Sequence, residues 1–274
     1  MRITGNTPGG LLIFGCLIYV LACAVLYVFQ EELIFFPEKL STDYEFRFDQ
    51  TFEEVSVKTK DGLNLNGVLF KADTSEGLIF YLHGNAGSIR SWGTIASHYT
   101  DLGYDLFILD YRGYGKSEGT IQNEVTFFSD IQTAYDLLKP RYNGQRIVIS
   151  GYSIGTGSAA WLASVNNPDL LILQAPYYSL TDMKDKLLPV IPDFVLKYKF
   201  ETYQFLENVE SPVIIFHGDR DEVISYQSSM KLQNHFKPGD VLITLRDQGH
   251  NGMSYNTAYR SELRQRLPTW VKKD

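Results

Sequence analysis

The chain of 274 residues carries a formal net charge of −7, with 44% hydrophobic and 21% charged residues. These values suit one large domain, or one domain plus an appendage, that buries a sizeable core. Because the chain is negative and shows no basic stripe, its composition excludes a nucleic acid as the expected partner. Both cysteines, Cys16 and Cys23, lie in an N-terminal apolar stretch, so disulfides cannot stabilise the rest of the chain.

The first predicted element is an apolar helix from Leu11 to Phe29, a run of 19 residues without a charge. A helix rises about 1.5 Å per residue, so this run would span roughly 28 Å, close to the hydrocarbon thickness of a bilayer. We therefore expect residues 1–30 to form a single transmembrane anchor, followed by a linker over residues 31–51.

A cleaved signal peptide is the main alternative, since Ala22-Cys23-Ala24 offers small residues at a cleavage-like site. Against it, the apolar run continues for five residues past Ala24, where a signal peptide would normally have turned polar. Lipoprotein attachment at Cys23 fits less well, because Val20-Leu21-Ala22 departs from the usual small-residue pattern.

The charges that flank the apolar helix indicate its orientation. Arg2 precedes it, whereas Glu31 and Glu32 follow it. The positive-inside bias then places the globular domain of this single-pass protein on the non-cytoplasmic side.

From about residue 52, short apolar runs alternate with helix-like stretches. Two runs, 53–59 and 63–70, flank a Lys60-Asp61-Gly62 turn and predict a hairpin. Six more predict strands buried on both faces of a parallel sheet: 78–84, 104–113, 146–153, 170–177, 212–219 and 241–250. Helices are expected at about 89–101, 122–139, 155–166, 226–236 and 255–272. The pattern predicts an α/β catalytic domain over 52–274, with a mostly parallel central sheet, an antiparallel N-terminal hairpin and helices on both faces.

The segment from about 178 to 210 breaks this alternation after the sixth predicted strand. It contains Pro189 and Pro192 and is rich in Leu, Tyr, Phe and Lys, which predicts a small helical cap. Its apolar residues either line an acyl pocket beside Ser153, the candidate nucleophile described next, or simply cover the sheet edge, and the sequence leaves both possibilities open.

A candidate nucleophile lies in Gly151-Tyr152-Ser153-Ile154-Gly155, between a predicted strand and a helix rich in small residues. This G-x-S-x-G pattern is typical of a sharp turn that exposes a strained serine above the sheet edge. The N–H groups at the helix start, beginning with that of Ile154, would point toward an anion formed at the serine.

The glycine-rich segment 83–87 ends another predicted strand and offers a second oxyanion donor. We assign that role to the backbone N–H of Asn85, working with that of Ile154. We expect His83 to hydrogen-bond the backbone of the loop instead of acting as an acid or base. The alternative is a simple turn after the strand.

A catalytic triad combines a nucleophile, a histidine and an acid. In this kind of fold the acid reaches the histidine ring from the loop after a late strand. The loop after the run 212–219 offers Asp221, which we assign to this role, with Asp219 and Glu222 as neighbouring candidates. More distant alternatives follow the sixth strand, at Asp182 and Asp185.

His250 follows the last predicted strand, where its loop would lie over the serine, and we assign it as the base. His98 and His235 lie in predicted helices, where a solvated or hydrogen-bonded histidine is the default. The order Ser153, Asp221, His250 differs from the orders in chymotrypsin-like and subtilisin-like enzymes.

The loop 110–119 has glycines at each sharp bend. We expect it to support the site structurally, with Asp110 and Arg112 fixing its conformation; a direct role in substrate binding is the alternative.

These motifs together resemble the α/β-hydrolase superfamily, and more narrowly its membrane-anchored serine hydrolases, often grouped with prolyl-oligopeptidase-like and serine-aminopeptidase-like families. The matching segments are HGNAG (83–87), DYRGYGKSEG (110–119), GYSIG (151–155), HGDRDEV (217–223) and GH (249–250), with QEELIFFP (30–37) after the anchor. The resemblance covers nearly the whole chain and implies the α/β-hydrolase fold. Its relatives include esterases, lipid hydrolases and protein depalmitoylases, so it leaves the substrate open.

The expected activity is hydrolysis of an ester or thioester by Ser153, His250 and Asp221 through an acyl-enzyme intermediate. The substrate would be a lipid, an acylated protein or a small ester, and this chemistry needs neither a metal nor an organic cofactor. Two alternatives stay open, a peptidase or amidase with the same triad and a non-catalytic scaffold on the same fold. A peptidase role has no support from domain structure, because the chain lacks the β-propeller-sized domain of oligopeptidases.

Overall fold

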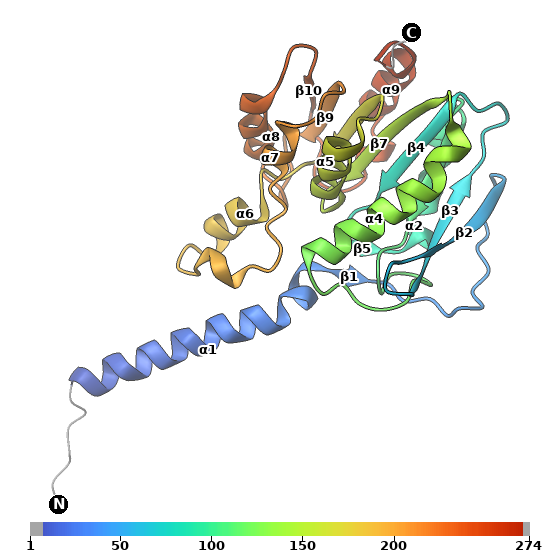
Figure 1. Cartoon of the computed structure of the whole chain (residues 1–274). Helices are drawn as coiled ribbons and strands as arrows, with labels where there is room; N and C mark the ends of the chain where they lie inside the picture. The colour runs from blue at the N-terminus through green and yellow to red at the C-terminus, as the bar shows by residue number, and fades with distance from the viewer. Residues whose placement is uncertain (1–7, 271–274) are drawn as a thin grey trace, which may run out of the picture.

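The computed structural model describes residues 8–270, in which a long N-terminal helix projects from an α/β domain (Figure 1). Within this range one eight-stranded sheet has the strand order β10-β9-β8-β7-β4-β6-β3-β2. Its strands are β2 (Phe52–Lys58), β3 (Asn64–Phe70), β4 (Gly77–Leu82), β6 (Asp105–Leu109), β7 (Arg146–Tyr152), β8 (Leu170–Gln174), β9 (Val213–Gly218) and β10 (Val241–Leu245).

The direction of the strands follows the predicted pattern. β2 pairs antiparallel with β3, and β3 pairs antiparallel with β6, whereas the other pairs in the sheet are parallel. Residues of β4, β7 and β8 are almost all buried, as expected for central strands covered on both faces. The mostly parallel α/β sheet with its antiparallel N-terminal hairpin is therefore confirmed.

Helices cover both faces of the sheet, and each face has its own core. One core contains side chains of α4 (Glu124–Leu138) and α5 (Gly155–Asn166). The other contains side chains of α3 (Ser97–Thr100) and α9 (Thr257–Trp270). Successive strand residues alternate between the two cores, as in Leu78 and Ile79, because side chains of a strand point to opposite faces.

Two predicted helices are more broken than the sequence pattern indicates. The expected helix at 89–101 consists of α2 (Ile89–Trp92), a 3₁₀ turn and α3. The expected helix at 226–236 is α8 (Gln227–Leu232) followed by another 3₁₀ turn. In the first case Gly93 lies against the ring of Phe48, and a side chain at Gly93 would collide with it.

The N-terminal helix α1 (Pro8–Ile34) continues beyond the boundary expected at residue 30. Residues 31–51, expected as a linker, pack against the domain. Here β1 (Phe36–Pro37) pairs with β5 (Ala86–Gly87), and the side chain of Phe46 is buried. The base of α1 is thereby fixed to the loop that follows β4.

The predicted cap lies between β8 and β9 and is mostly irregular. It contains α6 (Leu180–Leu187), a 3₁₀ turn (Asp193–Val195) and α7 (Thr202–Leu206). In Figure 1 the cap lies beside α1, on the side of the sheet from which α1 projects.

The loop 110–119 is held by buried polar groups. Arg112 donates to Asp130 and, at 2.8 Å, to Asp61. Asp110 accepts from the backbone N–H of Ile89 at 2.9 Å, and burial raises the pKa of its carboxyl to about 8. Asp110 and Arg112 thus fix the loop as expected.

Replacing Arg112 by Met should lower the free energy of unfolding by roughly 3–5 kcal/mol, because the buried carboxylate of Asp130 loses its cation. Arg141→Met is the matched control, since Arg141 and its partner Glu53 are both exposed, and it should cost less than about 1 kcal/mol. Denaturant titration of the full chain in detergent measures both. Equal losses of unfolding free energy in the two variants would show that the buried pair stabilises the fold no more than the exposed pair.

Candidate active site

Ser153 occupies a strained turn between β7 and α5. Its φ of 51° lies in the left-handed region, which a residue with a side chain rarely adopts. The turn is compact because Gly155 lies against the backbone of Leu82, where a side chain would collide with the Leu82 carbonyl. Ser153 N–H donates to the Gln174 carbonyl of β8 at 2.9 Å, which fixes the turn at the carboxyl edge of the sheet.

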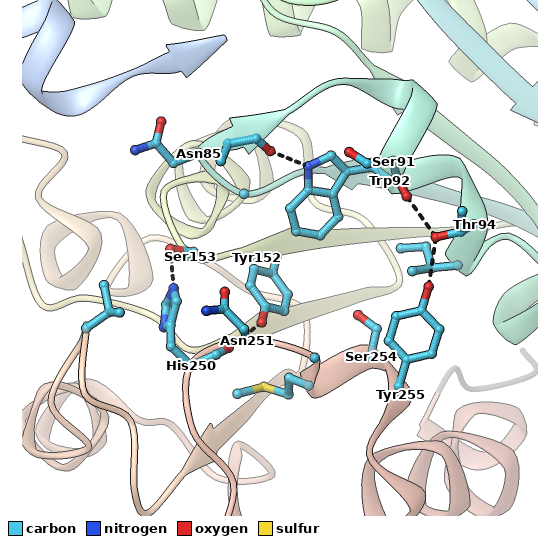
Figure 2. Close-up of a pocket in the computed structure, with 16 residues that line it drawn as sticks. Asn85, Ser91, Trp92, Thr94, Tyr152, Ser153, His250, Asn251, Ser254 and Tyr255 are labelled. Carbon is cyan, nitrogen blue, oxygen red and sulfur yellow. Dashed lines mark hydrogen bonds between the residues drawn. The ribbon is translucent and has the colours of Figure 1, made fainter. Parts of the chain in front are cut away.

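Ser153, His250 and Asp221 form a hydrogen-bonded chain, although three different loops carry them. His250 Nε2 lies 2.9 Å from Ser153 Oγ, and His250 Nδ1 lies 2.8 Å from Asp221 Oδ2 (Figure 2 shows the Ser153–His250 bond). A carboxylate can only accept, so the Nδ1 of the neutral ring carries the proton and Nε2 accepts from the serine hydroxyl. In this tautomer His250 can take the proton of Ser153 when the serine attacks a carbonyl carbon.

The side chain of Asp221 is fully buried and is held from several sides. Its Oδ1 accepts from the backbone N–H groups of Val223 at 2.9 Å and Ile224 at 2.7 Å. Burial alone would raise the pKa of Asp221, but hydrogen bonds from His217 and His250 outweigh it and hold the pKa well below its usual value. Asp221 therefore stays ionised, as a group that stabilises a positive imidazole must.

His217 is a buried neighbour of Asp221 that our sequence analysis did not single out. Its Nε2 lies 2.8 Å from the Ile224 carbonyl and 3.3 Å from Asp221 Oδ2, while Nδ1 lies 2.6 Å from Ser229 Oγ. Since a carbonyl can only accept, Nε2 carries a proton and points toward the carboxylate. The signal was present in the sequence, because His217 lies near the end of β9 and Asp221 lies in the loop that follows this strand.

The other candidate acids lie elsewhere. Asp219 accepts from the backbone N–H of Asp247 at 2.7 Å, and Glu222 accepts from the backbone of His250 at 3.3 Å. Asp182 and Asp185 pair with lysines of the cap and of α8. Of the five carboxylates proposed from the sequence, the structure brings Asp221 to the His250 ring.

Tyr152 fixes the loop that carries His250. Its hydroxyl donates to the His250 carbonyl, and burial raises the pKa of Tyr152 to about 12, so the hydroxyl remains a donor. Figure 2 shows this contact beneath Ser153. Tyr152 was visible in the G-x-S-x-G motif, but a motif alone does not reveal a contact 98 residues further along the chain.

The two assigned oxyanion donors flank Ser153. Within residues 8–270 the N–H groups of Asn85 and Ile154 have no hydrogen-bond acceptor, and in Figure 2 Asn85 lies on the opposite side of Ser153 from His250. The Oδ1 atom of the Asn85 side chain accepts from Phe36 N–H at 3.0 Å and from the Tyr114 hydroxyl at 3.1 Å, and these bonds hold the residue in place. The backbone N–H of Asn85 is then free to serve a substrate oxygen.

His83 is fully buried, and its Nδ1 lies 2.7 Å from the Gly84 carbonyl. Burial lowers the pKa of His83 to about 4, so it is neutral at pH 7. It bonds loop backbone, as the sequence predicts.

Two cavities meet at Ser153. One, of about 450 Å³, is lined by His250, Tyr152 and residues of the loops that follow β4 and β10; we name it the His250-side cavity. The other, of about 370 Å³, is lined by Ile154, the cap and α1; we name it the cap-side cavity. No Asp or Glu lines either cavity among the described residues, and residues 8–270 contain no group of three or more His, Cys, Asp or Glu placed to hold a metal ion.

Comparison with known proteins identifies the family. Residues 73–203 match the family described as serine aminopeptidase, S33. The chain is 30% identical to YfhR of Escherichia coli O157:H7 over 211 residues, which cover 72% of this chain and 73% of YfhR. It is 29% identical to protein bem46 of Schizosaccharomyces pombe over 224 residues, covering 75% and 74% of the two chains.

Solved structures show the same fold at lower sequence identity. An esterase of Pyrococcus furiosus, Pf2001, superposes with a TM-score of 0.68 at 18% identity, covering 87% of this chain and 98% of the esterase. XC6422 of Xanthomonas campestris, described as an α/β serine hydrolase without a lid, gives 0.63 at 15% identity, covering 84% and 100%. The chain belongs to the α/β-hydrolase family together with its relative YfhR, and is similar to bem46.

Proposed function

We propose that this hydrolase is a membrane-anchored enzyme that cleaves carboxylic ester or thioester bonds through an acyl-enzyme intermediate. The observation that carries the proposal is the hydrogen-bonded chain Ser153–His250–Asp221 at the meeting point of two cavities. Ser153 attacks the carbonyl carbon while His250 takes its proton, and the ionised Asp221 stabilises the imidazolium. The N–H groups of Asn85 and Ile154 stabilise the oxyanion, and water activated by His250 then releases the acyl group.

On this proposal the position of His250 supports a different role for each cavity. His250 must protonate the leaving group, so the alcohol or thiol belongs in the His250-side cavity. The acyl chain then lies in the cap-side cavity, which Leu188, Ile191 and Val195 of the cap help to line.

An aminopeptidase, the activity for which the family is named, has less support. Such an enzyme needs a carboxylate to hold the ammonium group of its substrate, and the described lining of both cavities contains none. The apolar cap-side cavity favours an acyl chain.

The membrane part of the proposal rests on α1. Residues Gly9–Ile34 form a helix long and apolar enough to cross a bilayer. Arg2 before it and Glu31 and Glu32 after it favour a catalytic domain on the non-cytoplasmic side.

Ser153→Ala should abolish labelling by a fluorophosphonate probe and lower hydrolysis of p-nitrophenyl butyrate by about 10⁶-fold, because the nucleophile is lost. Circular dichroism checks that the variant keeps its fold. Turnover near the wild-type value in a folded variant would remove Ser153 from the mechanism.

Asp221→Asn should lower kcat by about 10⁴-fold, because the amide favours the wrong tautomer of His250. Asp219→Asn is the matched control two residues away and should lower kcat far less, since within residues 8–270 the carboxylate of Asp219 bonds only the backbone of Asp247. The opposite ranking of the two variants would refute the assignment of the acid.

Specificity should rise with acyl length if the cap-side cavity holds the chain. Each buried methylene contributes about 0.8 kcal/mol, which is roughly fourfold in kcat/KM until the cavity is full. Measurement of kcat/KM for p-nitrophenyl esters from C2 to C12 tests this. A profile that is flat or falls beyond C4 argues for a small ester or a peptide-like substrate.

A further inference from the structure

One face of α1 is turned toward the catalytic domain. Tyr19, Cys23, Leu26, Gln30 and Ile34 recur at the three- and four-residue spacing of one helix face, and Gln30 is buried. The rest of the apolar part of α1 is largely exposed. A helix that served only as a tether would have no reason to bond the domain along one face.

Two contacts fasten this face to the cap. Near the base of α1, Gln30 Nε2 donates to the Val195 carbonyl at 3.0 Å, and its Oε1 accepts from Lys197 N–H at 2.8 Å. Further along, the Tyr19 hydroxyl donates to the Val190 carbonyl at 2.7 Å. Tyr19 and Gln30 lie about 16 Å apart along the helix axis, given a rise of 1.5 Å per residue.

The cap-side cavity lies between α1 and the cap. Leu26, Gln30, Leu33 and Ile34 of α1 line it together with the cap, and it reaches Ser153. The cavity is thus made partly from the helix that we propose to cross the membrane.

We name residues 187–194 of the cap, which include Val190 bonded by Tyr19, the cap tip. It presents Leu187, Val190 and Phe194 with 75%, 71% and 81% of their surface exposed. An apolar patch of this kind marks an interaction site, and here it continues the apolar surface of α1 through the Tyr19–Val190 contact. Hydrocarbon is the environment that suits both surfaces at once.

The charges of the cap are compatible with this placement. Lys184 pairs with Asp185 and with Asp193, so the cation next to the apolar patch has carboxylate partners of opposite sign. The carboxylates of Asp185 and Asp193 are more than half exposed, so they limit the depth of insertion to the near leaflet.

We propose that α1 is one wall of the acyl-binding cavity and that the cap tip enters the near leaflet beside it. The acyl chain of a bilayer lipid ester then reaches Ser153 from the hydrocarbon without crossing water. This inference rests on the proposed function, to which it adds a lipid substrate class and a role for the anchor in specificity.

Depth-dependent quenching tests the position of the cap tip and needs no catalytic activity. Full-length Phe194→Trp, reconstituted in phosphatidylcholine vesicles, should lose at least half of its added tryptophan emission when the acyl chains are brominated. Leu137→Trp is the matched control, since Leu137 is also exposed and lies near the end of α4 remote from α1 (Figure 1). Equal quenching of the two variants, or release of the protein from vesicles by carbonate, would overturn the inference.

Selectivity for acyl chain length tests whether α1 forms one side of the acyl-binding cavity. Leu26→Trp should lower the ratio of kcat/KM for p-nitrophenyl decanoate to that for the butyrate by tenfold or more, because the larger ring fills the cavity. Val28→Trp places the same ring on the exposed side of α1 and should leave the ratio unchanged. An unchanged ratio in Leu26→Trp would remove α1 from the binding site.

Failure of the proposed function gives a different result. A wild-type protein that neither reacts with the fluorophosphonate nor cleaves any ester would end the proposed function. An active wild-type enzyme with an unquenched cap tip and an unchanged ratio would end only the inference.

Discussion

The strained turn at Ser153 is the constraint on which the site depends. It requires helix α5 to start directly against β4, which Gly155 allows because the helix passes too close to the Leu82 carbonyl for a side chain. A positive φ at Ser153 costs conformational energy, and the bonds from the turn to β8 maintain it. Since parallel strands end at the same edge of the sheet, the turn lies beside the loops that follow β4, β9 and β10.

The surroundings of the acid show how a buried charge is kept in place. Asp221 loses its hydration, and two backbone N–H groups, His217 and His250 replace it. Groups fixed in this way need not reorganise when the imidazole becomes charged. Asp219 belongs to the same loop but accepts from the backbone of a neighbouring loop. Asp219 and Asp221 are only two residues apart, yet Asp219 makes a structural contact and Asp221 lies at the candidate site.

The base of α1 contacts a residue of the candidate active site. β1 pairs with β5 just after Asn85, and Phe36 N–H donates to the Asn85 side chain. The segment that follows α1 therefore orients a residue assigned to the oxyanion site. The same helix contributes to the cap-side cavity, so on our proposal anchoring, acyl binding and oxyanion geometry share one structural element.

Local patterns in the sequence determined the sheet, its hairpin, the turn at Ser153 and the position of the last loop with His250. Strand burial and glycine placement are short-range properties, and they appear in the sequence as apolar runs and spaced glycines. Contacts between distant residues were decided by the tertiary structure. It selected Asp221 among five carboxylates, placed His217 behind it and joined Gln30 to Val195 across 165 residues. We expected a linker over residues 31–51 because their contacts are with distant loops. A local sequence pattern does not indicate contacts with residues far away in the chain.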